Sequence, residues 1–272
     1  PTDQGSKLIT IKNNHIAYPT WYTIPTTVKN NAGGEGGTLQ GRITCKKPSA
    51  QTFPPPIKNC ICSRFPEGKI ISMDLSQIAG LLSGDQAFIN AYQNDEDLHE
   101  QRARQIFDDV NDNYHARRQA AKMINFADLF RAGANTMQKQ LLGMTGIEFD
   151  IQFIKDIVNK RRLHRPKLWN FQNKLIAEAN NKGRLELPFT GQSRYFLGGE
   201  INEINEIVNF PIQTTASNTL LSIQAYIHKH MTSMNFKNPP MYMFLNIYDA
   251  IYFDVRDEIT EDILKCLVEE AV

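Results

Sequence analysis

The feature that most constrains the fold is a long block of helical pattern placed between stretches of strand-like pattern. Apolar residues recur at helical spacing from about residue 86 to residue 181, whereas short apolar runs typical of strands precede and follow this block. An order of strands, helices, strands and a last helix is typical of α+β proteins. We therefore predict an α+β fold whose helices form an inserted lobe.

The same patterns predict the individual elements. Strands are expected at Lys69–Asp74, in a hairpin of Leu185–Phe189 with Arg194–Leu197, and in a second hairpin over Met241–Val255 with its tip near Asp249, with Leu8–Ile11 as a further candidate. Helices are expected from Gln77 to Leu82, over residues 86–143 and 150–181, over Asn205–His230 with a start or kink at Pro211, and over Glu258–Val272.

The composition is that of a soluble globular protein. A chain of 272 residues forms one large domain or two small ones, and 41% hydrophobic with 22% charged residues is ordinary for this class. The formal net charge is +1, so any surface for nucleic acid must come from local clusters of Lys and Arg. The cysteines fit no metal-ligand spacing, and no long apolar run or signal segment is present, which predicts an intracellular protein with reduced thiols and no membrane contact.

A regular spacing marks the stretch from Arg118 to Phe130, in which Arg118, Lys122, Phe126 and Phe130 follow one another every four residues. On an α-helix this spacing places them along one side. Two cations followed by two flat rings would suit a nucleoside triphosphate. The alternative is an amphipathic helix with both Phe side chains in the core and both cations solvated. A second basic cluster, Lys160–Arg165, is open to two interpretations, a solvated turn or a phosphate contact.

Two apolar runs each end in an aspartate, Asp74 after Lys69–Met73 and Asp249 after Phe244–Tyr248. Taken singly, such an Asp can be a turn former or a helix cap, and Ser76 and Gln77 could serve the same cap. The three stretches in this order resemble motifs A, B and C of the family A DNA polymerases. Thr38-Leu-Gln-Gly41-Arg42 with the segment to Lys58, and Asn205–Gln213, are similar to two DNA-contacting stretches of that family, so the resemblance runs from about Thr38 to Val255.

The resemblance implies a polymerase core made of palm and fingers. Residues 1–85 would be the N-terminal part of the palm, 86–183 the helical fingers and 184–272 the C-terminal part of the palm. Such a core adds deoxynucleotides to a primer 3′ end during DNA replication by phosphoryl transfer with two Mg²⁺ ions. Its partners would be primer–template DNA and deoxynucleoside triphosphates, in the cytoplasm of a bacterial or phage-infected cell.

The resemblance also implies roles for residues. Asp74 and Asp249 would be the catalytic carboxylates that hold Mg²⁺, and Leu75 would be a further metal contact. The nucleotide would contact Arg118, Lys122, Phe126, Phe130, Ser76, Gln77 and Ile78, and Phe126 implies discrimination against dideoxynucleotides. DNA would contact Arg42, Gln51, Asn209, Gln213 and Tyr248, with weaker binding by Asn205, which replaces an Arg. Arg194 is expected to support its hairpin.

The chain departs from the family at several points. After Ile78 the simplest alignment lacks four residues, about one helical turn, including the Glu that serves as the family's ribose gate. Tyr248-Asp249-Ala250 replaces His-Asp-Glu, and Arg131 replaces a Gly. The usual thumb and exonuclease portions are not visible, so they, or a processivity partner, are expected outside this chain, and the core should be distributive.

Three alternatives remain open at this point. The first is a palm-and-fingers module that grips nucleic acid but is catalytically impaired by the missing turn. The second is a single-subunit RNA polymerase, which Phe130 disfavours because that class carries Tyr there. The third is an α+β domain whose Asp residues are caps.

Overall fold

The computed structural model describes residues 20–22, 42–46, 49–75, 78–94, 96–107, 114–188, 190–196 and 203–271. The predictions made for Leu8–Ile11, Thr38–Gly41, Ser76, Gln77, Phe189 and Leu197 lie outside the described residues. The chain divides into two compact units, one formed by Pro1–Ser76 with Gln213–Val272 and the other by Gln77–Ile212. The predicted palm and fingers boundaries, at 85/86 and 183/184, are functional divisions and stay a prediction.

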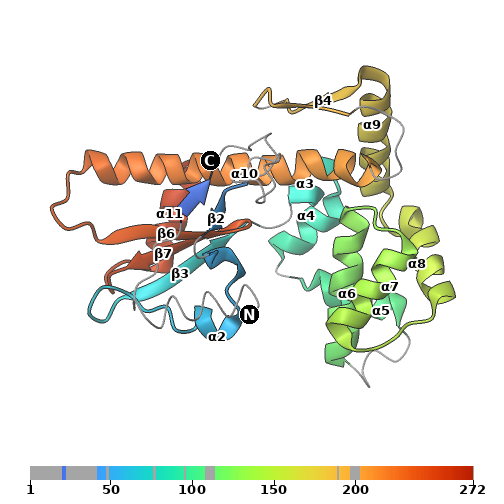
Figure 1. The fold of residues 1–272 in the computed structure, drawn as a ribbon, viewed down its shortest axis with the longest axis horizontal. Helices are drawn as coiled ribbons and strands as arrows, with labels where there is room; N and C mark the ends of the chain where they lie inside the picture. Colours follow the sequence, from blue (N-terminus) through green and yellow to red (C-terminus); the bar gives the residue numbers. More distant parts are fainter. Residues whose placement is uncertain are drawn as a thin grey trace. The chain divides into compact units, whose positions relative to one another are not determined.

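The first unit contains a three-stranded antiparallel sheet (Figure 1). Its strands lie in the order β3 (Lys69–Asp74), β7 (Ala250–Val255) and β6 (Met241–Ile247). The predicted strand before Asp74 and the predicted hairpin over Met241–Val255 are both confirmed. In the register, Lys69 pairs with Val255 and Asp74 with Ala250, so β3 ends beside the turn that joins β6 to β7.

Two apolar layers cover this sheet. On one face, Ile71, Ile251 and Phe253 pack against the C-terminal half of α10 (Glu203–Ser233) and against α11 (Glu261–Ala271). A register shift between Met243 and Leu245 turns the end of β6, and Leu245 and Ile247 then pack with Cys45 and Phe53 in the opposite layer. That layer also includes β2 (Thr44–Lys46), paired with β1 (Thr20–Tyr22), and the short helices η1 (Ala50–Thr52) and α2 (Pro55–Lys58).

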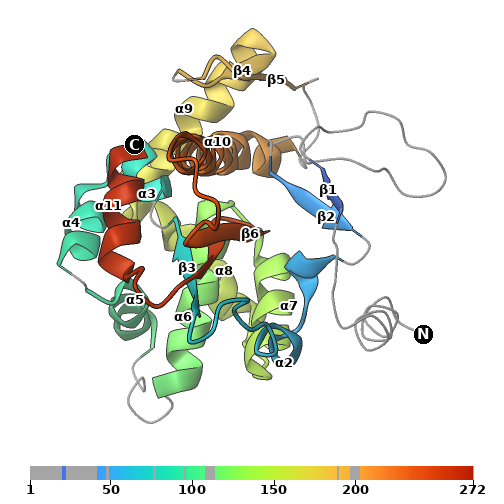
Figure 2. The same ribbon diagram turned by 90° about the vertical axis from the view of Figure 1, so that its left-hand side faces the viewer.

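The second unit is mainly helical, as the sequence predicts (Figure 2). Its helices are α3 (Ile78–Ser83), α4 (Gln86–Gln93), α5 (Leu98–Ile106), α6 (Tyr114–Leu129), α7 (Ala134–Thr145), α8 (Ile151–His164) and α9 (Pro166–Lys182). The predicted hairpin is also present, as the antiparallel pair β4 (Arg184–Glu186) and β5 (Ser193–Tyr195). Arg194 forms an ion pair with Glu206 and lies over the Phe196 ring, which agrees with its expected support of the hairpin.

The core of this unit combines an apolar cluster with buried charges. Ile124, Met137, Leu141 and Ile154 are fully buried between α6, α7 and α8. Beside them Arg102 pairs with Asp128 at 3.3 Å, and both side chains are buried. A buried pair of this kind stabilises little over apolar packing, but it fixes where α5 lies against α6.

Two predictions about helices need adjustment. Helix α10 runs from Glu203 to Ser233 with Pro211 inside it, and the last helix begins at Glu261 rather than at Glu258. The antiparallel sheet with a separate helical unit confirms the α+β class. All four cysteines are free thiols, and none of the helices in the described part of the chain is long and apolar enough to cross a membrane.

Candidate functional site

The two predicted catalytic aspartates meet at one end of the sheet of the first unit. Asp74 is the last residue of β3 and pairs with Ala250, the residue that follows Asp249. The backbone N–H of Leu75 donates to the carbonyl oxygen of Asp249 at 2.9 Å, which joins the two chain segments directly. Asp74 is exposed and Asp249 is half-buried. Antiparallel pairing therefore places both carboxyl groups at the same edge, although they are 175 residues apart in sequence.

A tight turn sets the direction of Asp249. Ile247 pairs with Ala250, so only Tyr248 and Asp249 form the loop between β6 and β7. Tyr248 has a φ of 53°, in the left-handed region that non-glycine residues seldom adopt. Such a conformation costs about 1–3 kcal/mol and occurs often at functional sites. The ring of Tyr248 is exposed, so its predicted contact with DNA is sterically open.

Arg42 lies on the carboxylate of Asp249. Its Nη2 donates to both carboxylate oxygens, at 2.8 and 3.0 Å, and the Arg42 side chain is 24% exposed. The sequence predicts instead that Arg42 contacts DNA. The structure thus gives Arg42 a partner in the chain, and that partner is one of the two predicted metal ligands.

The donor set at this edge fits Mg²⁺. Mg²⁺ is usually held by one or two carboxylates together with substrate phosphates. Asp74 and Asp249 supply those carboxylates, and among the described residues no third His, Cys, Asp or Glu joins them in a metal-binding group. For Asp249 to bind a cation, however, the guanidinium of Arg42 must move, because it occupies both oxygens.

We expect the variant Arg42→Ala to bind a divalent cation more tightly than the wild-type chain. A partly exposed ion pair contributes up to about 1 kcal/mol, which corresponds to a roughly fivefold gain in affinity when the competitor is removed. Calorimetric titration with Mn²⁺ measures this change. Lys69→Ala is the matched control. It also removes one positive charge from this unit, but Lys69 pairs with the exposed Asp257 and not with Asp249. Unchanged affinity in Arg42→Ala would contradict the expected competition.

The regular four-residue spacing of motif B forms one face of α6. Phe126 is 46% exposed, and Arg118, Lys122 and Phe130 are partly exposed, whereas Ala120, Ala121, Ile124 and Ala127 on the other side are buried. Helix α6 ends at Leu129, so Phe130 lies just past its last turn. The alternative that places Phe126 in the core is therefore wrong, and the ring is available to a ligand.

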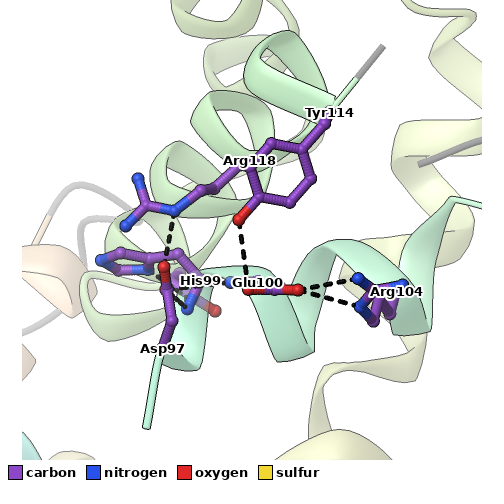
Figure 3. Close-up of polar contacts among 7 residues, drawn as sticks. Asp97, His99, Glu100, Arg104, Tyr114 and Arg118 are labelled. Carbon is purple, nitrogen blue, oxygen red and sulfur yellow. Dashed lines mark hydrogen bonds and ion pairs between the residues drawn. The ribbon is translucent and has the colours of Figure 1, made fainter. Parts of the chain in front are cut away.

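Arg118 is held by an aspartate that precedes α5. Its Nε donates to Asp97 at 2.6 Å, and the terminal nitrogens of the guanidinium point away from that carboxylate (Figure 3). Asp97 also caps α5, since its carboxylate accepts from the N–H groups of His99 and Glu100. Burial raises the pKa of Asp97, but the bonds from Arg118 and from the two amides outweigh burial, so the pKa lies below its usual 3.8.

We expect Asp97→Ala to lower the free energy of unfolding at pH 7 by about 1–2 kcal/mol, from the lost cap and a partly exposed ion pair. Because the folded pKa of Asp97 is depressed, its contribution is present above the unfolded value of 3.8 and is lost as the pH falls below it. Urea denaturation at pH 7 and pH 3 measures both effects. Asp150→Ala is the control, since Asp150 caps α8 with two similar backbone bonds and, within the described residues, pairs with no arginine.

His99, at the start of α5, lies beside this face of α6, and the sequence assigns it no role. Its ring lies 6.2 Å from that of Phe126 and beside the Asp97–Arg118 pair in Figure 3. Burial is the main reason that the pKa of His99 lies below its usual 6.5; Asp97 opposes the shift, and the charges of Lys122 and Arg118 add to it. The available signal was Asp97-Leu98-His99, an N-cap residue two positions before a histidine at the start of a helix.

Several other predicted site residues have structural partners. Gln51 is buried, and its amide forms hydrogen bonds with the backbone of Ile43, Cys45 and Asn246. Gln51 therefore joins β2 to β6 and is not part of the proposed DNA surface. With its amide nitrogen facing these acceptors, Asn205 donates to the carbonyl oxygen of Phe130 at 2.9 Å and to that of Arg131 at 3.2 Å. Asn205 therefore caps the end of α6, which the sequence did not predict. Asn209 and Gln213 are half-buried one helical turn apart on α10.

Arg131 stands where the family has a glycine, and its contacts show how an arginine is accommodated there. Its φ is 52°, a left-handed conformation that glycine adopts without strain. The side chain compensates by lying 3.9 Å over the Trp169 ring and donating to Gln172 and Asn173 of α9. Arg131 thereby fastens the end of α6 to α9.

Comparison with known proteins agrees with this arrangement. A family model described as DNA polymerase family A matches residues 17–272. The thermostable DNA polymerase I of Thermus caldophilus is 24% identical over 292 residues, covering 99% of this chain and 33% of that protein. The DNA polymerase of Mycobacterium phage D29 is 28% identical over 175 residues, covering 64% of this chain and 26% of that protein.

A solved structure shows the same fold. It is the POL domain of Pol1 from M. smegmatis in complex with DNA primer-template and dNTP, with a TM-score of 0.76 and 17% identity, covering 99% of this chain and 47% of that chain. The chain spans between about a quarter and a third of the length of the curated relatives it matches.

Proposed function

Since the chain belongs to DNA polymerase family A, we propose that it is a template-directed DNA polymerase core that adds deoxynucleotides to a primer 3′ end. The observation that carries this proposal is the placement of Asp74 and Asp249 at one edge of the sheet, joined by the bond from Leu75. In the proposal these carboxylates hold two Mg²⁺ ions, with the Leu75 carbonyl as a further ligand. Bound Mg²⁺ would neutralise charge on the reacting phosphates.

The proposed nucleotide contacts follow from the exposed face of α6. Lys122 and the terminal nitrogens of Arg118 would bind the triphosphate, Lys122 as a point charge and Arg118 as a fork. Phe126 would pack against the sugar and base of the incoming nucleotide, and His99 would donate to a phosphate oxygen. Asp97 is a positioning residue in this scheme, because it fixes the guanidinium of Arg118.

Primer–template DNA is the proposed macromolecular partner. Tyr248, Asn209 and Gln213 are the proposed contacts, and Arg42 would join them once it leaves Asp249. The relatives named DNA polymerase from bacteria and from a phage support replication in the cytoplasm of a bacterial or phage-infected cell. Ile78, at the start of α3, would lie near the nucleotide sugar, and the family's ribose gate is among the four residues that the simplest alignment lacks after it.

A second candidate function is a nucleic-acid-binding module without catalysis. The observation that favours it is the contact of Arg42 Nη2 with both carboxylate oxygens of Asp249, which occupies a proposed metal ligand. The two functions differ in what happens when cation, DNA and nucleotide are all present. If Arg42 stays on Asp249, the chain binds DNA and does not extend it.

Primer extension and primer–template binding, measured on the same preparation, separate the two functions. The purified chain is given Mg²⁺, labelled primer–template and deoxynucleotides, with ribonucleotides in a parallel reaction, and binding is followed by fluorescence anisotropy at two salt concentrations. Extension establishes the polymerase, and extension with ribonucleotides shows that sugar discrimination is weak without the gate. Binding without extension would overturn the first proposal in favour of the second.

A further inference from the structure

Arg165, at the junction of α8 and α9, has a buried side chain that neither interpretation of the basic cluster Lys160–Arg165 explains. Arg165 is 8% exposed, whereas Lys160 and His164 in the same cluster are exposed. Both interpretations are therefore wrong for Arg165. Its side chain is not solvated, and it is not exposed to bind a phosphate from solvent. Burying a guanidinium is unfavourable unless its environment compensates for the lost hydration. The contacts of Arg165 show which residues compensate for its burial.

The guanidinium of Arg165 is held in place from two sides. It lies 4.5 Å over the ring of Phe88, a cation–π contact. Phe88 in turn packs so closely on Gly80 that a Cβ at that position would come within 2.9 Å of the ring. Burial lowers the pKa of Arg165 to about 10, with Asp128 and Asp85 opposing the shift, so the side chain stays charged at neutral pH.

Arg165 uses one of its N–H groups to orient an amide. Its Nη2 donates to Oδ1 of Asn125 at 2.7 Å, and Asn125 is 3% exposed. A guanidinium can only donate, so the atom of Asn125 that faces it must be the oxygen. The amide nitrogen of Asn125 then lies 2.9 Å from Nδ1 of His99. An amide nitrogen can also only donate, so Nδ1 must accept, and the ring proton must be on Nε2.

We propose that Arg165 and Asn125 are positioning residues that hold His99 in the Nε2–H tautomer. Nε2 is the nitrogen that does not face Asn125, and His99 lies beside Arg118 and Phe126. In this tautomer the ring offers a hydrogen-bond donor to a phosphate oxygen of the incoming nucleotide. In the other tautomer Nε2 would present a lone pair to that oxygen, which is repulsive. The part that concerns phosphate rests on the proposed function.

The same geometry keeps His99 neutral. Protonation would place a hydrogen on Nδ1 facing the N–H of Asn125, which removes that hydrogen bond. The charged groups around the ring are Asp97 at the start of α5, Arg118 and Lys122 on α6, and Arg165 from the α8–α9 junction. Three of these four are cations, so they add to the effect of burial. The donor on Nε2 is therefore present in the neutral ring and needs no protonation of His99.

Nitrogen NMR of the chain with ¹⁵N-labelled histidine tests the tautomer directly, since the two ring nitrogens of each tautomer resonate far apart. His99→Ala assigns the signals. The wild-type chain is expected to show the proton on Nε2 of His99. Asn125→Asp replaces the donor by an acceptor and should move the proton to Nδ1 or charge the ring. Arg165→Met should give a mixture of tautomers, and Arg165→Lys, which keeps a donor, should restore the wild-type pattern.

Nucleotide affinity tests the consequence. Arg165→Met is expected to weaken binding of a deoxynucleoside triphosphate about tenfold, which corresponds to about 1.4 kcal/mol, because the hydrogen bond from His99 to the phosphate is partly lost. In the His99→Ala background the same substitution should cost clearly less, because only the effect of lost charge remains. Equal losses in both backgrounds, or an unchanged His99 tautomer in Asn125→Asp and Arg165→Met, would overturn the proposal. A tautomer that responds as expected in a chain that binds no nucleotide would instead refute the proposed function.

Discussion

Replacing Asp249 by Ala is expected to reduce the rate of primer extension roughly 10³-fold, because one of the two carboxylates proposed to hold Mg²⁺ is lost. Loss of a carboxylate ligand removes several kcal/mol of charge stabilisation, and about 1.4 kcal/mol corresponds to tenfold in rate. Asp249 lies in a two-residue turn, so a change of its side chain leaves the pairing of β6 with β7 in place. Single-turnover extension with saturating primer–template measures the effect.

Two further variants separate loss of the metal ligand from loss of folding. Asp249→Asn keeps the size of the side chain and an oxygen for Arg42, and it should be as inactive as Asp249→Ala. Asp257→Ala removes an exposed carboxylate beyond the other end of β7, paired only weakly with Lys69 at 3.2 Å, and should retain full activity. A chain with Asp249→Asn that extends primers at the wild-type rate would refute the role assigned to Asp249.

Replacing Lys122 by Ala is expected to lower kcat/KM for the deoxynucleotide up to about 100-fold. Lys122 lies on the same face of α6 as the exposed ring of Phe126, and a charge-assisted bond to phosphate contributes about 1.5–3 kcal/mol. Because the contact is proposed to be with the nucleotide alone, the affinity for primer–template should change little. Steady-state kinetics with varied nucleotide, together with anisotropy for DNA, measures the two quantities separately.

A matched substitution on the neighbouring helix controls for the loss of charge. Lys139 is exposed on α7, and Lys139→Ala removes one positive charge from the same unit without touching α6. It should leave kcat/KM within about twofold of wild type, because exposed charges beyond a Debye length of about 8 Å are screened. Equal losses in the two variants would mean that Lys122 acts through the general field of the unit and not through a contact.

Local patterns were sufficient to predict most of the strands and helices, whereas the link between Asp74 and Asp249 was implied by the resemblance to family A DNA polymerases. The alternating run Met241–Val255 and the apolar run before Asp74 each specify a strand, and antiparallel pairing then brings their aspartates together. The four-residue spacing from Arg118 to Phe126 likewise specifies one face of a helix. The strands and the helix face need only the periods of strand and helix, but the pairing of β3 with β7 depends on packing between segments far apart in the sequence.

The partners of the charged side chains could not be predicted in the same way. Arg42 reaches Asp249 across 207 positions of sequence, and Arg165 reaches Asn125 across 40. Neither contact follows from a local period, since each depends on how distant elements pack. The same holds for Gln51, which has the composition of a surface residue but is buried because three backbone groups satisfy its amide. His99 was predictable only in part. Asp97-Leu98-His99 indicates the start of a helix, but the neighbours of His99 on α6 depend on how the two helices pack.

Incorporation of a single nucleotide opposite each of the four template bases tests whether synthesis by this chain is directed by the template. The purified chain, Mg²⁺ and one deoxynucleotide at a time are combined with four primer–templates that differ only in the next template base, giving sixteen reactions. Each template is expected to accept mainly its complementary nucleotide, and all incorporation should disappear in Asp249→Asn. Incorporation that ignores the template base, or that survives in Asp249→Asn, would contradict this expectation.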